Sequence, residues 1–437
     1  MSKQTLETVR LDKIVGGGQA IGTLADGRKA FVWGGLPGEL VEIQITKKKS
    51  KLIEGVVREV IEAADERITP LDETSYMSTS PWQIMSFASE QKNKISLIEE
   101  AFALHNISLT DNIEIYTDGI EYGYRNKVEF SWYSDIDEES GADTLDLAFF
   151  RRGSRGKVVV EGTSLAREEI NKLAVAIRDL LRIKNISARQ LKTLLIRSDQ
   201  QGNCVWQLYT KDHLNSLFSE EEVNTLPAQG GEVIYSDPKS PASRITERLQ
   251  AFGNTMLTDT ILDIPFHYTC EGFFQVNIPV YQTALKDMAK WIEGSSNKNV
   301  IDLYSGVGTI GLTIGGDAVT LVEINEYAVA EMKRNITSLG RQNAQAVLAP
   351  SEKSLSHLDG KDIVIIDPPR AGLHADVVEK LLQTKPEKII YLSCNPVTQA
   401  RDVALLTQSY TLAETRGYNF FPRTPHIETA CLLTLSQ

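Results

Sequence analysis

Two side chains with reactive groups follow neighbouring apolar runs near the C-terminus. The run DIVIIDPPRAGL places Asp367 at the end of one predicted strand, and KIIYLSCNP places Cys394 at the end of the next. The two prolines after Asp367 can neither continue a helix nor donate to a sheet ladder. Because ligands of open parallel sheets bind at the carboxyl ends of the strands, both groups are expected to face one crevice. Most cysteines are small buried hydrophobes, but one at this place is a candidate nucleophile.

A glycine-rich turn lies further upstream, in NVIDLYSGVGTIGL. Gly306 and Gly308 follow an apolar run there, and together with Gly311 they formally satisfy the spacing G-x-G-x-x-G. Glycine lets the backbone approach a ligand closely, and Glu323, which ends the next apolar run, can accept hydrogen bonds from both hydroxyls of a ribose. The turn therefore predicts a nucleotide-type cofactor. By itself it leaves nicotinamide, flavin and S-adenosylmethionine open.

The elements that must position these residues alternate in type. From about residue 298 onward, apolar runs alternate with helical stretches, which predicts an α/β fold with a parallel sheet covered on both faces. The last two runs, YTLAETRGYNFF and IETACLLTL, are joined by a proline-containing link that is too short for a crossover helix. We therefore expect a closing antiparallel pair.

The N-terminal part has a different pattern. Residues 9–60 read as short strands between glycine-rich turns, which predicts a small antiparallel barrel. The segment EQKNKISLIEEAFALH then predicts a helix with Ile95, Ile98 and Phe102 on one face. The middle of the chain is mixed strand and helix without a repeat.

Composition favours a multidomain enzyme in a reducing compartment. The 437 residues exceed what one ordinary core holds. Hydrophobic residues make up 42% and charged residues 24%, and no apolar run approaches the roughly 20 residues that a membrane span needs. The N-terminus lacks the apolar core of a secretory signal, and the four cysteines have no disulfide or metal-type spacing. We therefore expect a soluble cytoplasmic protein with no membrane partner.

The net charge of -12 argues against a nucleic-acid partner when the chain is taken as a whole. Residues 1–60 depart from that balance, since they contain ten Lys or Arg and seven Asp or Glu. Two local basic groups stand out, although a solvated charged face explains each of them equally well. They are Lys47, Lys48, Lys49 and Lys51, and Arg151, Arg152, Arg155 and Lys157.

Four motifs in a fixed order give the chain a specific resemblance. DLYSGVGTIGL, DPPRAGL, YLSCNPVTQARDV and HIETACLL resemble, in order and spacing, the RNA uridine-5-methyltransferases, and FFQVN at residues 273–277 matches the segment before the cofactor domain of that family. The resemblance implies an S-adenosylmethionine-dependent enzyme. It also implies a class I methyltransferase sheet of Rossmann-like type at the C-terminus, an N-terminal β-barrel and a mixed α+β central domain.

The resemblance covers nearly the whole chain and divides it into three predicted domains. Residues 1–62 are similar to the family's TRAM barrel, an RNA-binding module of the OB type. Residues 63–264 are expected to form a central RNA-binding domain, and residues 265–437 the methyltransferase domain. The implied partner is RNA, with 23S ribosomal RNA favoured over transfer RNA on the resemblance alone. A self-contained active site makes a monomer the simplest expectation.

The chemistry of this family explains why a cysteine is needed. Uracil C5 is a poor nucleophile, so a thiolate first adds to C6, which makes C5 enolate-like and able to take a methyl group. The resemblance assigns this role to Cys394. The adduct then carries both a hydrogen and a methyl group at C5, and a base must remove that proton before the thiolate can leave. Glu428, in HIETA, matches the family's base, whereas His426 is interpreted as a structural residue.

The resemblance also identifies the residues that contact the cofactor. Tyr304 lies in the glycine turn, and Glu323 would bind the ribose. The family's asparagine after the second glycine is replaced here by Thr309, so that contact is not expected. The predicted cofactor-binding residues are Gln275, Tyr304, Gly306, Gly308, Glu323 and Asp367.

A larger departure lies just after the predicted barrel. Many relatives hold a four-iron cluster there with three cysteines and a fourth further on, but this stretch reads LDETSYMSTSPWQIMSF, and no cysteine precedes Cys204. Because such a cluster needs cysteine thiolate ligands, we predict no iron-sulfur cluster and no other metal. Trp82 and its neighbours are expected to fill the volume with apolar packing.

The target base must leave its stack before C5 and C6 can be reached from both sides. Phe273, Phe274 and the run Tyr418 to Phe421 are candidate stacking groups, with ordinary core packing as an equally good interpretation.

Two other functions remain open at this point. Amino-group methyltransferases also use DPP motifs but need no cysteine, so Cys394 discriminates against them. An RNA chaperone with dispensable catalysis would use the barrel and the enclosing fold, and the sequence does not decide which activity matters.

Overall fold

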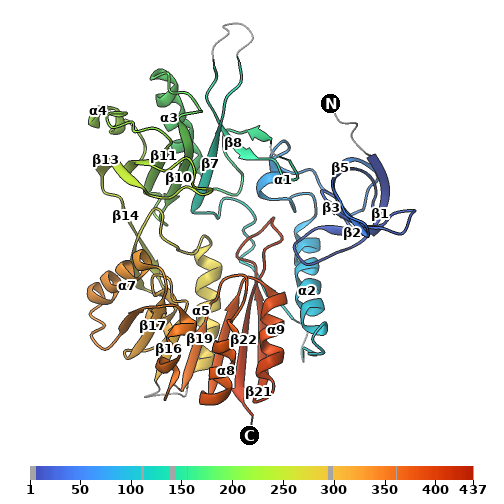
Figure 1. Ribbon diagram of the computed structural model, residues 1–437, viewed down its shortest axis with the longest axis vertical. Coiled ribbons are helices and arrows are strands. Elements are labelled where there is room, and N and C mark those ends of the chain that lie inside the picture. Colours follow the sequence, from blue (N-terminus) through green and yellow to red (C-terminus); the bar gives the residue numbers. More distant parts are fainter. Residues whose placement is uncertain are drawn as a thin grey trace.

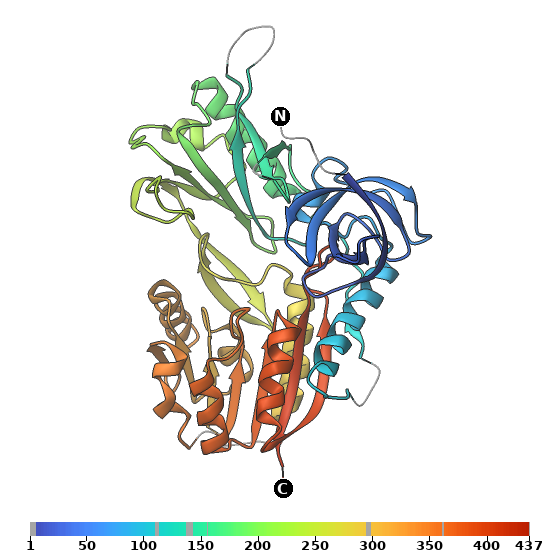
Figure 2. The same cartoon turned by 45° about the vertical axis from the view of Figure 1, so that its right-hand side comes forward.

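The computed structural model describes residues 6–109, 113–136, 143–154, 156–293, 299–360 and 362–436. It shows a barrel beside two larger β-sheet bodies, one above the other (Figure 1). In the second view the barrel lies above helix α2 (Phe87–Ala103), which runs beside the C-terminal strands (Figure 2). None of the described helices is long and apolar enough to cross a membrane.

The N-terminal barrel is closed in the strand order β1-β2-β3-β5-β4. Alternating side chains of these strands, such as Val41 and Ile43, are buried in its core. The expectation of a wholly antiparallel barrel was wrong at one pair, because β3 and β5 run parallel where the barrel closes. The strands are β1 (Leu6–Ile14), β2 (Ala20–Thr23), β3 (Lys29–Trp33), β4 (Leu40–Lys48) and β5 (Leu52–Glu62).

The upper body is a seven-stranded sheet in the order β13-β12-β11-β10-β7-β8-β9. Helix α3 packs its apolar stripe, which includes Ile170 and Ile177, against one face of the sheet. The elements are β7 (Lys127–Tyr133), β8 (Asp146–Phe150), β9 (Lys157–Val159), α3 (Glu168–Ile183), β10 (Leu191–Ser198), β11 (Cys204–Thr210), α4 (Glu220–Val223), β12 (Gly230–Tyr235) and β13 (Glu247–Gly253). A hairpin of β14 (Met256–Ile261) and β15 (Ile264–Thr269) leads to the lower body.

The lower body is an eight-stranded sheet in the order β18-β17-β16-β19-β20-β22-β21-β6. Its first five strands are parallel, which confirms the predicted α/β fold. The predicted closing antiparallel pair is also present, as β21 and β22. The strands are β6 (Ile115–Tyr116), β16 (Val300–Leu303), β17 (Val319–Glu323), β18 (Gln345–Leu348), β19 (Ile363–Ile366), β20 (Lys388–Ser393), β21 (Tyr410–Tyr418) and β22 (Glu428–Leu435).

Helices cover both faces of this sheet. On one face α5 (Ile278–Ile292), α6 (Thr309–Ile314) and α7 (Glu326–Ser338) share a core with the strands. On the other face lie α8 (Ala375–Thr384), α9 (Pro396–Leu406) and α2. The short helices α1 (Tyr76–Thr79), η1 (Ser351–Lys353) and η2 (Leu355–Leu358) complete the described fold.

Helix α2 and strand β6 reach this sheet from much earlier in the chain. Ile98 and Phe102 of α2 are fully buried, as the sequence predicted, but Ile95 is only partly buried. Glu90 and Lys94, two charged residues, are instead fully buried on the packed face of the helix. β6 adds an edge strand parallel to β21, which the sequence pattern did not indicate.

Candidate active site

Strand register brings Cys394 and Glu428 together. Ser393 at the end of β20 pairs with Thr429 of β22, so the next position along the antiparallel ladder places Cys394 opposite Glu428. Glu428 is buried, whereas Cys394 is partly exposed. The other three cysteines are buried. Among the cysteines that the structure describes, Cys394 is therefore the one with an exposed portion.

Asp367 lies at the same edge of the sheet. It follows β19, which runs parallel to β20 with Ile366 paired to Tyr391. Burial raises the pKa of the Asp367 carboxyl to about 7. Burial, reinforced by the charge of Asp367, holds the pKa of Glu428 well above its usual range. Both carboxyl groups are thus poorly solvated, and the charge of Asp367 also discourages ionisation of Glu428.

The thiol shares this environment. Burial raises the pKa of Cys394 to about 11, and the negative charges of Glu428 and Asp367 act in the same direction. Arg370 opposes them through its charge and a hydrogen bond to the thiol. The exposed Arg370 is thus the cation that favours the thiolate.

Sequence reasoning missed this role of Arg370. Its guanidinium also donates to Nδ1 of His426 at 2.6 Å. Burial and the charge of Arg370 lower the pKa of His426 to about 4, so the imidazole is neutral near pH 7 and can accept that bond. The backbone oxygen of Arg370 accepts bonds from Asn395 Nδ2 at 2.9 Å and Thr398 Oγ1 at 3.1 Å. The arginine in DPPRAGL, three positions after Asp367, was the feature of the sequence that could have indicated this role.

A cleft beside these groups is lined by several of the predicted cofactor-binding residues. Gln275, Tyr304, Gly306 and Asp367 all face it, together with Phe273 and other side chains. Tyr304 has the left-handed φ of 62°, which lets the chain turn sharply after β16. At Gly306 an added Cβ would meet only Phe273 Cδ1, at 3.8 Å, so space is open directly above the backbone.

Glu323 and Gly308 are not among the residues that line this cleft, but both belong to the structure of the turn. The amide of Gly306 donates to Glu323 Oε2 at 3.0 Å, and the amide of Asn325 donates to Oε1 at 2.8 Å. Gly308 caps α6 with a φ of 89°. Glu323, which is expected to bind the ribose, is therefore held in place by backbone amides, one of which belongs to the glycine turn.

Asp302 is a second residue that sequence reasoning missed. It is fully buried under the turn, where its Oδ2 accepts from the amide of Gly311 at 2.8 Å. Its Oδ1 has no hydrogen-bond partner among the described residues. Burial raises the pKa of this carboxyl well above its usual value. The aspartate in DLYSG was the available signal.

Thr309, which departs from the family pattern, has a local partner. Its Oγ1 lies 2.8 Å from the hydroxyl of Tyr281 on α5, and both residues line the cleft. The pair joins α5 to the first turn of α6.

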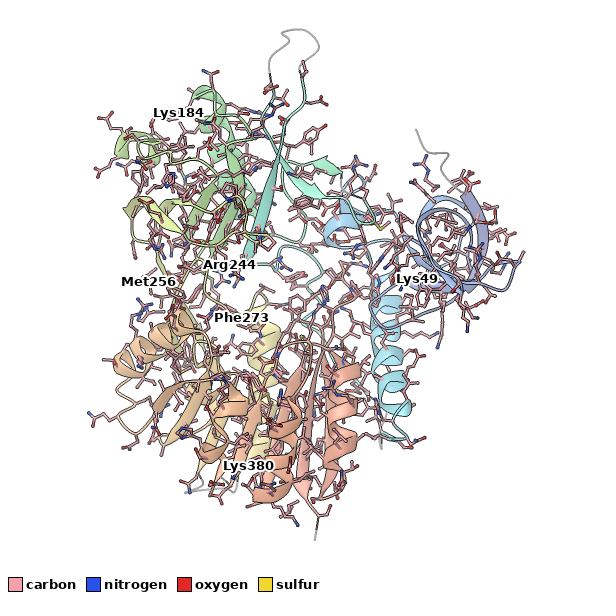
Figure 3. The ribbon with its side chains drawn as sticks, viewed as in Figure 1. Lys49, Lys184, Arg244, Met256, Phe273 and Lys380 are labelled. Carbon is pink, nitrogen blue, oxygen red and sulfur yellow. The ribbon has the colours of Figure 1, made fainter. Side chains whose placement is uncertain are left out.

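The aromatic residues that were predicted as candidates for base stacking differ in their exposure to solvent. Phe273 is 64% exposed and lies at the junction of the two larger sheets (Figure 3). Phe274, Tyr418 and Phe420 are buried in the core, so the stacking interpretation was wrong for them. Phe421 is partly buried and packs edge-on against His426.

The predicted basic groups are mostly on the surface. Lys47 pairs with Glu54 at 2.9 Å, and Lys48, Lys49 and Lys51 are exposed. Arg152 stacks on the ring of Trp33 in the barrel at 4.1 Å. The Lys157 ammonium lies over the ring of Phe150 at 4.9 Å. Arg151 is exposed, and Arg155 lies outside the described residues.

Comparisons with known proteins relate the chain to RNA methyltransferases. The model of the tRNA (uracil-5-)-methyltransferase family matches residues 86–436. A protein of Enterococcus faecalis described as an RNA methyltransferase is 29% identical, with 92% of each chain covered. One of Nitratidesulfovibrio vulgaris with the same description is 28% identical over 98% of this chain and 95% of its own.

A solved structure shows the same fold. The tRNA (uracil-54, C5)-methyltransferase of Pyrococcus abyssi, in complex with S-adenosyl-L-homocysteine, superposes with a TM-score of 0.77 at 22% identity. The match covers 98% of this chain and all of that one. Because the family model matches most of the chain, the chain belongs to the tRNA (uracil-5-)-methyltransferase family and is an RNA methyltransferase.

Proposed function

We propose that the protein methylates carbon 5 of a uridine in RNA through a covalent bond between Cys394 and C6. The observation that carries the proposal is the strand register that sets Cys394 opposite Glu428, with Asp367 beside them. A nucleophile and a base on facing strands are what addition to C6 and removal of the C5 proton require.

The cleft residues fit S-adenosylmethionine as methyl donor. The open space above Gly306 admits a ligand close to the backbone, and Glu323 is held where it could accept bonds from ribose hydroxyls. We propose Gln275, Tyr304, Gly308 and Asp367 as the remaining cofactor-binding residues. Bound there, S-adenosylmethionine supplies an electrophilic methyl group on a sulfonium sulfur.

The proposed reaction balances at the uracil ring. The partly exposed Cys394 thiol gives its proton to solvent, its sulfur bonds to C6, and the electron pair of the C5–C6 double bond moves towards C5. C5 uses that pair to take the methyl group. The Glu428 carboxylate then removes the C5 proton, the C5–C6 double bond re-forms, and the pair of the C6–sulfur bond returns to Cys394. Because its pKa is raised, Glu428 is a stronger base than an ordinary carboxylate.

Arg370 and Phe273 complete the proposed site. Arg370 stabilises the thiolate that adds to C6 and the thiolate that leaves. The exposed ring of Phe273, at the rim of the cleft, is available to stack on a uracil that has left its own stack.

We propose ribosomal RNA as the substrate on the sequence resemblance, and transfer RNA as the second candidate. Two observations support transfer RNA instead. They are the description of the matching family and the shared fold with a tRNA (uracil-54, C5)-methyltransferase. Mapping 5-methyluridine in total RNA with and without the gene separates them, because only the true substrate loses the modification.

The proposed domains are a TRAM-like RNA-binding barrel at 1–62, a central RNA-binding domain at 63–264 and a methyltransferase domain at 265–437, in a monomer. The stretch 63–264 also supplies α2 and β6 to the catalytic sheet. Arg152, stacked on Trp33, ties the seven-stranded sheet to the barrel.

Cys394→Ala tests the proposal. The variant should make no 5-methyluridine and form no denaturation-resistant complex with RNA carrying 5-fluorouridine, a base whose C5 fluorine cannot be abstracted. Full methylation by the variant would instead favour an amino-group or other cysteine-independent mechanism. Equal RNA annealing by wild type and variant would show that any chaperone activity is separate from catalysis.

A further inference from the structure

Helix α2 carries an ion pair in the protein interior. Glu90 and Lys94 are both fully buried, one helical turn apart, with 2.9 Å between Oε1 and Nζ. Removing two charges from water is costly, and an apolar pair of similar size would often pack at least as well. The other hydrogen bonds of Glu90 and Lys94 give a reason for burying the pair.

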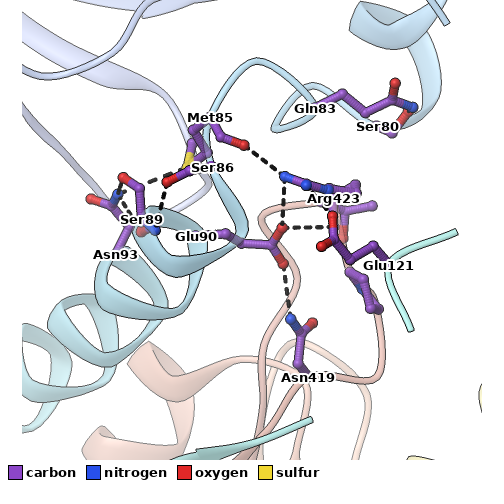
Figure 4. Close-up of polar contacts among 12 residues, drawn as sticks. Ser80, Gln83, Met85, Ser86, Ser89, Glu90, Asn93, Glu121, Asn419 and Arg423 are labelled. Carbon is purple, nitrogen blue, oxygen red and sulfur yellow. Dashed lines mark hydrogen bonds and ion pairs between the residues drawn. The ribbon is translucent and has the colours of Figure 1, made fainter. Parts of the chain in front are cut away.

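Those bonds reach the loop of residues 419–427, which joins β21 to β22, and Figure 4 shows the bonds that Glu90 makes. Lys94 Nζ donates to Asn419 Oδ1 at 2.7 Å and to the backbone oxygen of Phe421 at 3.1 Å. Glu90 accepts from Asn419 Nδ2 and from the amide of Arg423, each at 2.9 Å. Two side chains of one helix thus hold the loop at three of its residues.

Arg423 extends the same network. Its φ is 64°, a left-handed conformation that costs energy for a residue with a side chain. Its buried guanidinium donates to the backbone oxygen of Met85 at 2.6 Å and forms an ion pair with Glu121. Its own backbone oxygen accepts from the amide of Trp82 at 3.2 Å. The surroundings therefore fix the Arg423 backbone from both sides.

This loop ends at the proposed catalytic base. Tyr418 pairs with Glu428, so residues 419–427 form the connection of a hairpin whose first residue after the loop is Glu428. His426, the partner of Arg370, is in the same loop. The loop leads directly into Glu428, whereas Cys394 follows β20, so the loop helps to set the position of Glu428 relative to Cys394.

We propose that Glu90 and Lys94 are positioning residues that hold the 419–427 loop so that Glu428 reaches the C5 proton of the methylated adduct. The inference rests on the proposed function. It predicts a larger defect in proton removal than in thiol addition, since Glu428 directly follows the loop, whereas the loop reaches Cys394 only through His426 and Arg370.

The main test is the double variant Glu90→Leu/Lys94→Met, which removes both charges together and with them the bonds to Asn419, Phe421 and Arg423. Its rate of adduct formation with 5-fluorouridine RNA should stay within about threefold of wild type, because that reaction stops before proton removal. On ordinary RNA, adduct breakdown should slow by at least about 10-fold, since a misplacement of about 1 Å can cost 100-fold. A denaturation-resistant complex should then accumulate.

Arg178→Met is the matched control. It removes another buried cation with an acidic partner, but on α3 of the seven-stranded sheet. This variant should form and break down the adduct at the same relative rates as wild type. Any loss of stability should be visible only in its melting curve.

The milder Glu90→Gln decides the matter if the double variant does not fold, because it keeps the shape of the side chain and one acceptor oxygen. It should show the same step-specific defect, at smaller size. Parallel loss of adduct formation and product release in a folded variant would overturn the proposal, as would wild-type kinetics. Methylation by Cys394→Ala would instead refute the proposed function, so the two failures are distinguishable.

Discussion

The guanidinium of Arg370 lies 2.6 Å from Nδ1 of His426, and the same side chain contacts the thiol of Cys394. The neutral imidazole orients the cation, and the cation favours the thiolate. This arrangement links the loop before β22 to the nucleophile after β20.

Replacing Arg370 by methionine should move the pH dependence of adduct formation. The charge of Arg370 lowers the pKa of Cys394, so its loss raises that pKa and leaves less thiolate at neutral pH. The rate of complex formation with 5-fluorouridine RNA, followed from pH 6 to 10, should rise later along the pH axis than in wild type. An unchanged profile would remove Arg370 from the activation of the thiol.

Glu428→Gln should trap the reaction after methyl transfer. The amide cannot accept the C5 proton, so the adduct on ordinary uridine RNA should persist and run as a denaturation-resistant complex containing the transferred methyl group. Cys394→Ala/Glu428→Gln should form no such complex. Normal turnover by the single variant would assign proton removal to another group.

Asp367→Asn should stabilise the protein more at pH 8 than at pH 5. Burial raises the pKa of Asp367 to about 7, so the folded state binds a proton that the unfolded state releases near pH 4. Stability therefore falls as pH rises through that window, and asparagine removes the cost of the buried charge. Melting temperatures at the two pH values measure the effect, and methylation should fall at both. An equal shift at both pH values would contradict the raised pKa.

Gly306→Ala should weaken S-adenosylmethionine binding more than it weakens the fold. The added Cβ has room in the protein but enters the space proposed for the ligand, and the left-handed φ costs about 1–2 kcal/mol. Gly311→Ala is the contrasting variant, because its Cβ would lie 2.3 Å from Leu321 Cδ2 in the core. Calorimetric titration and melting curves should show opposite rankings for the two variants.

Freshly purified protein should contain no stoichiometric iron and show no visible absorption from a cluster. The prediction rests on the absence of any cysteine before Cys204. Trp82, in the corresponding stretch, is buried and donates from Nε1 to the backbone oxygen of Gly18 in the barrel. Iron bound in a fixed ratio, lost when Cys204 or Cys270 is replaced, would refute it.

Local pattern was sufficient for much of the fold. The alternation of apolar runs and helices predicted the parallel sheet, and the short link before HIETACLL predicted the antiparallel closure. The position of Asp367 and Cys394 at one edge followed from strand ends alone. These features depend on neighbours in the chain or on the rule that parallel strands end on one side of a sheet.

Contacts between segments that are far apart in the sequence could not be predicted. Nothing in EQKNKISLIEEAFALH showed that Lys94 would be buried, because a lysine is normally at the surface and its partner Asn419 belongs to another part of the chain. The two-residue strand β6 is too short to give a pattern. Arg370 was visible as a residue type, but its contact with His426 depends on the β21–β22 loop.

The bond between Lys94 and Asn419 joins positions 325 residues apart and has a consequence for how the enzyme is made. Helix α2 leaves the ribosome long before β22 is synthesised, so Glu90 and Lys94 must remain solvated while most of the chain is still missing. Bringing such distant segments together is entropically costly and slow. Once β22 is made, the same segment that pairs with β20 and β21 also brings Glu428 to the site. A nascent chain that already has its cofactor turn and its cysteine remains without its base until Glu428 has been synthesised.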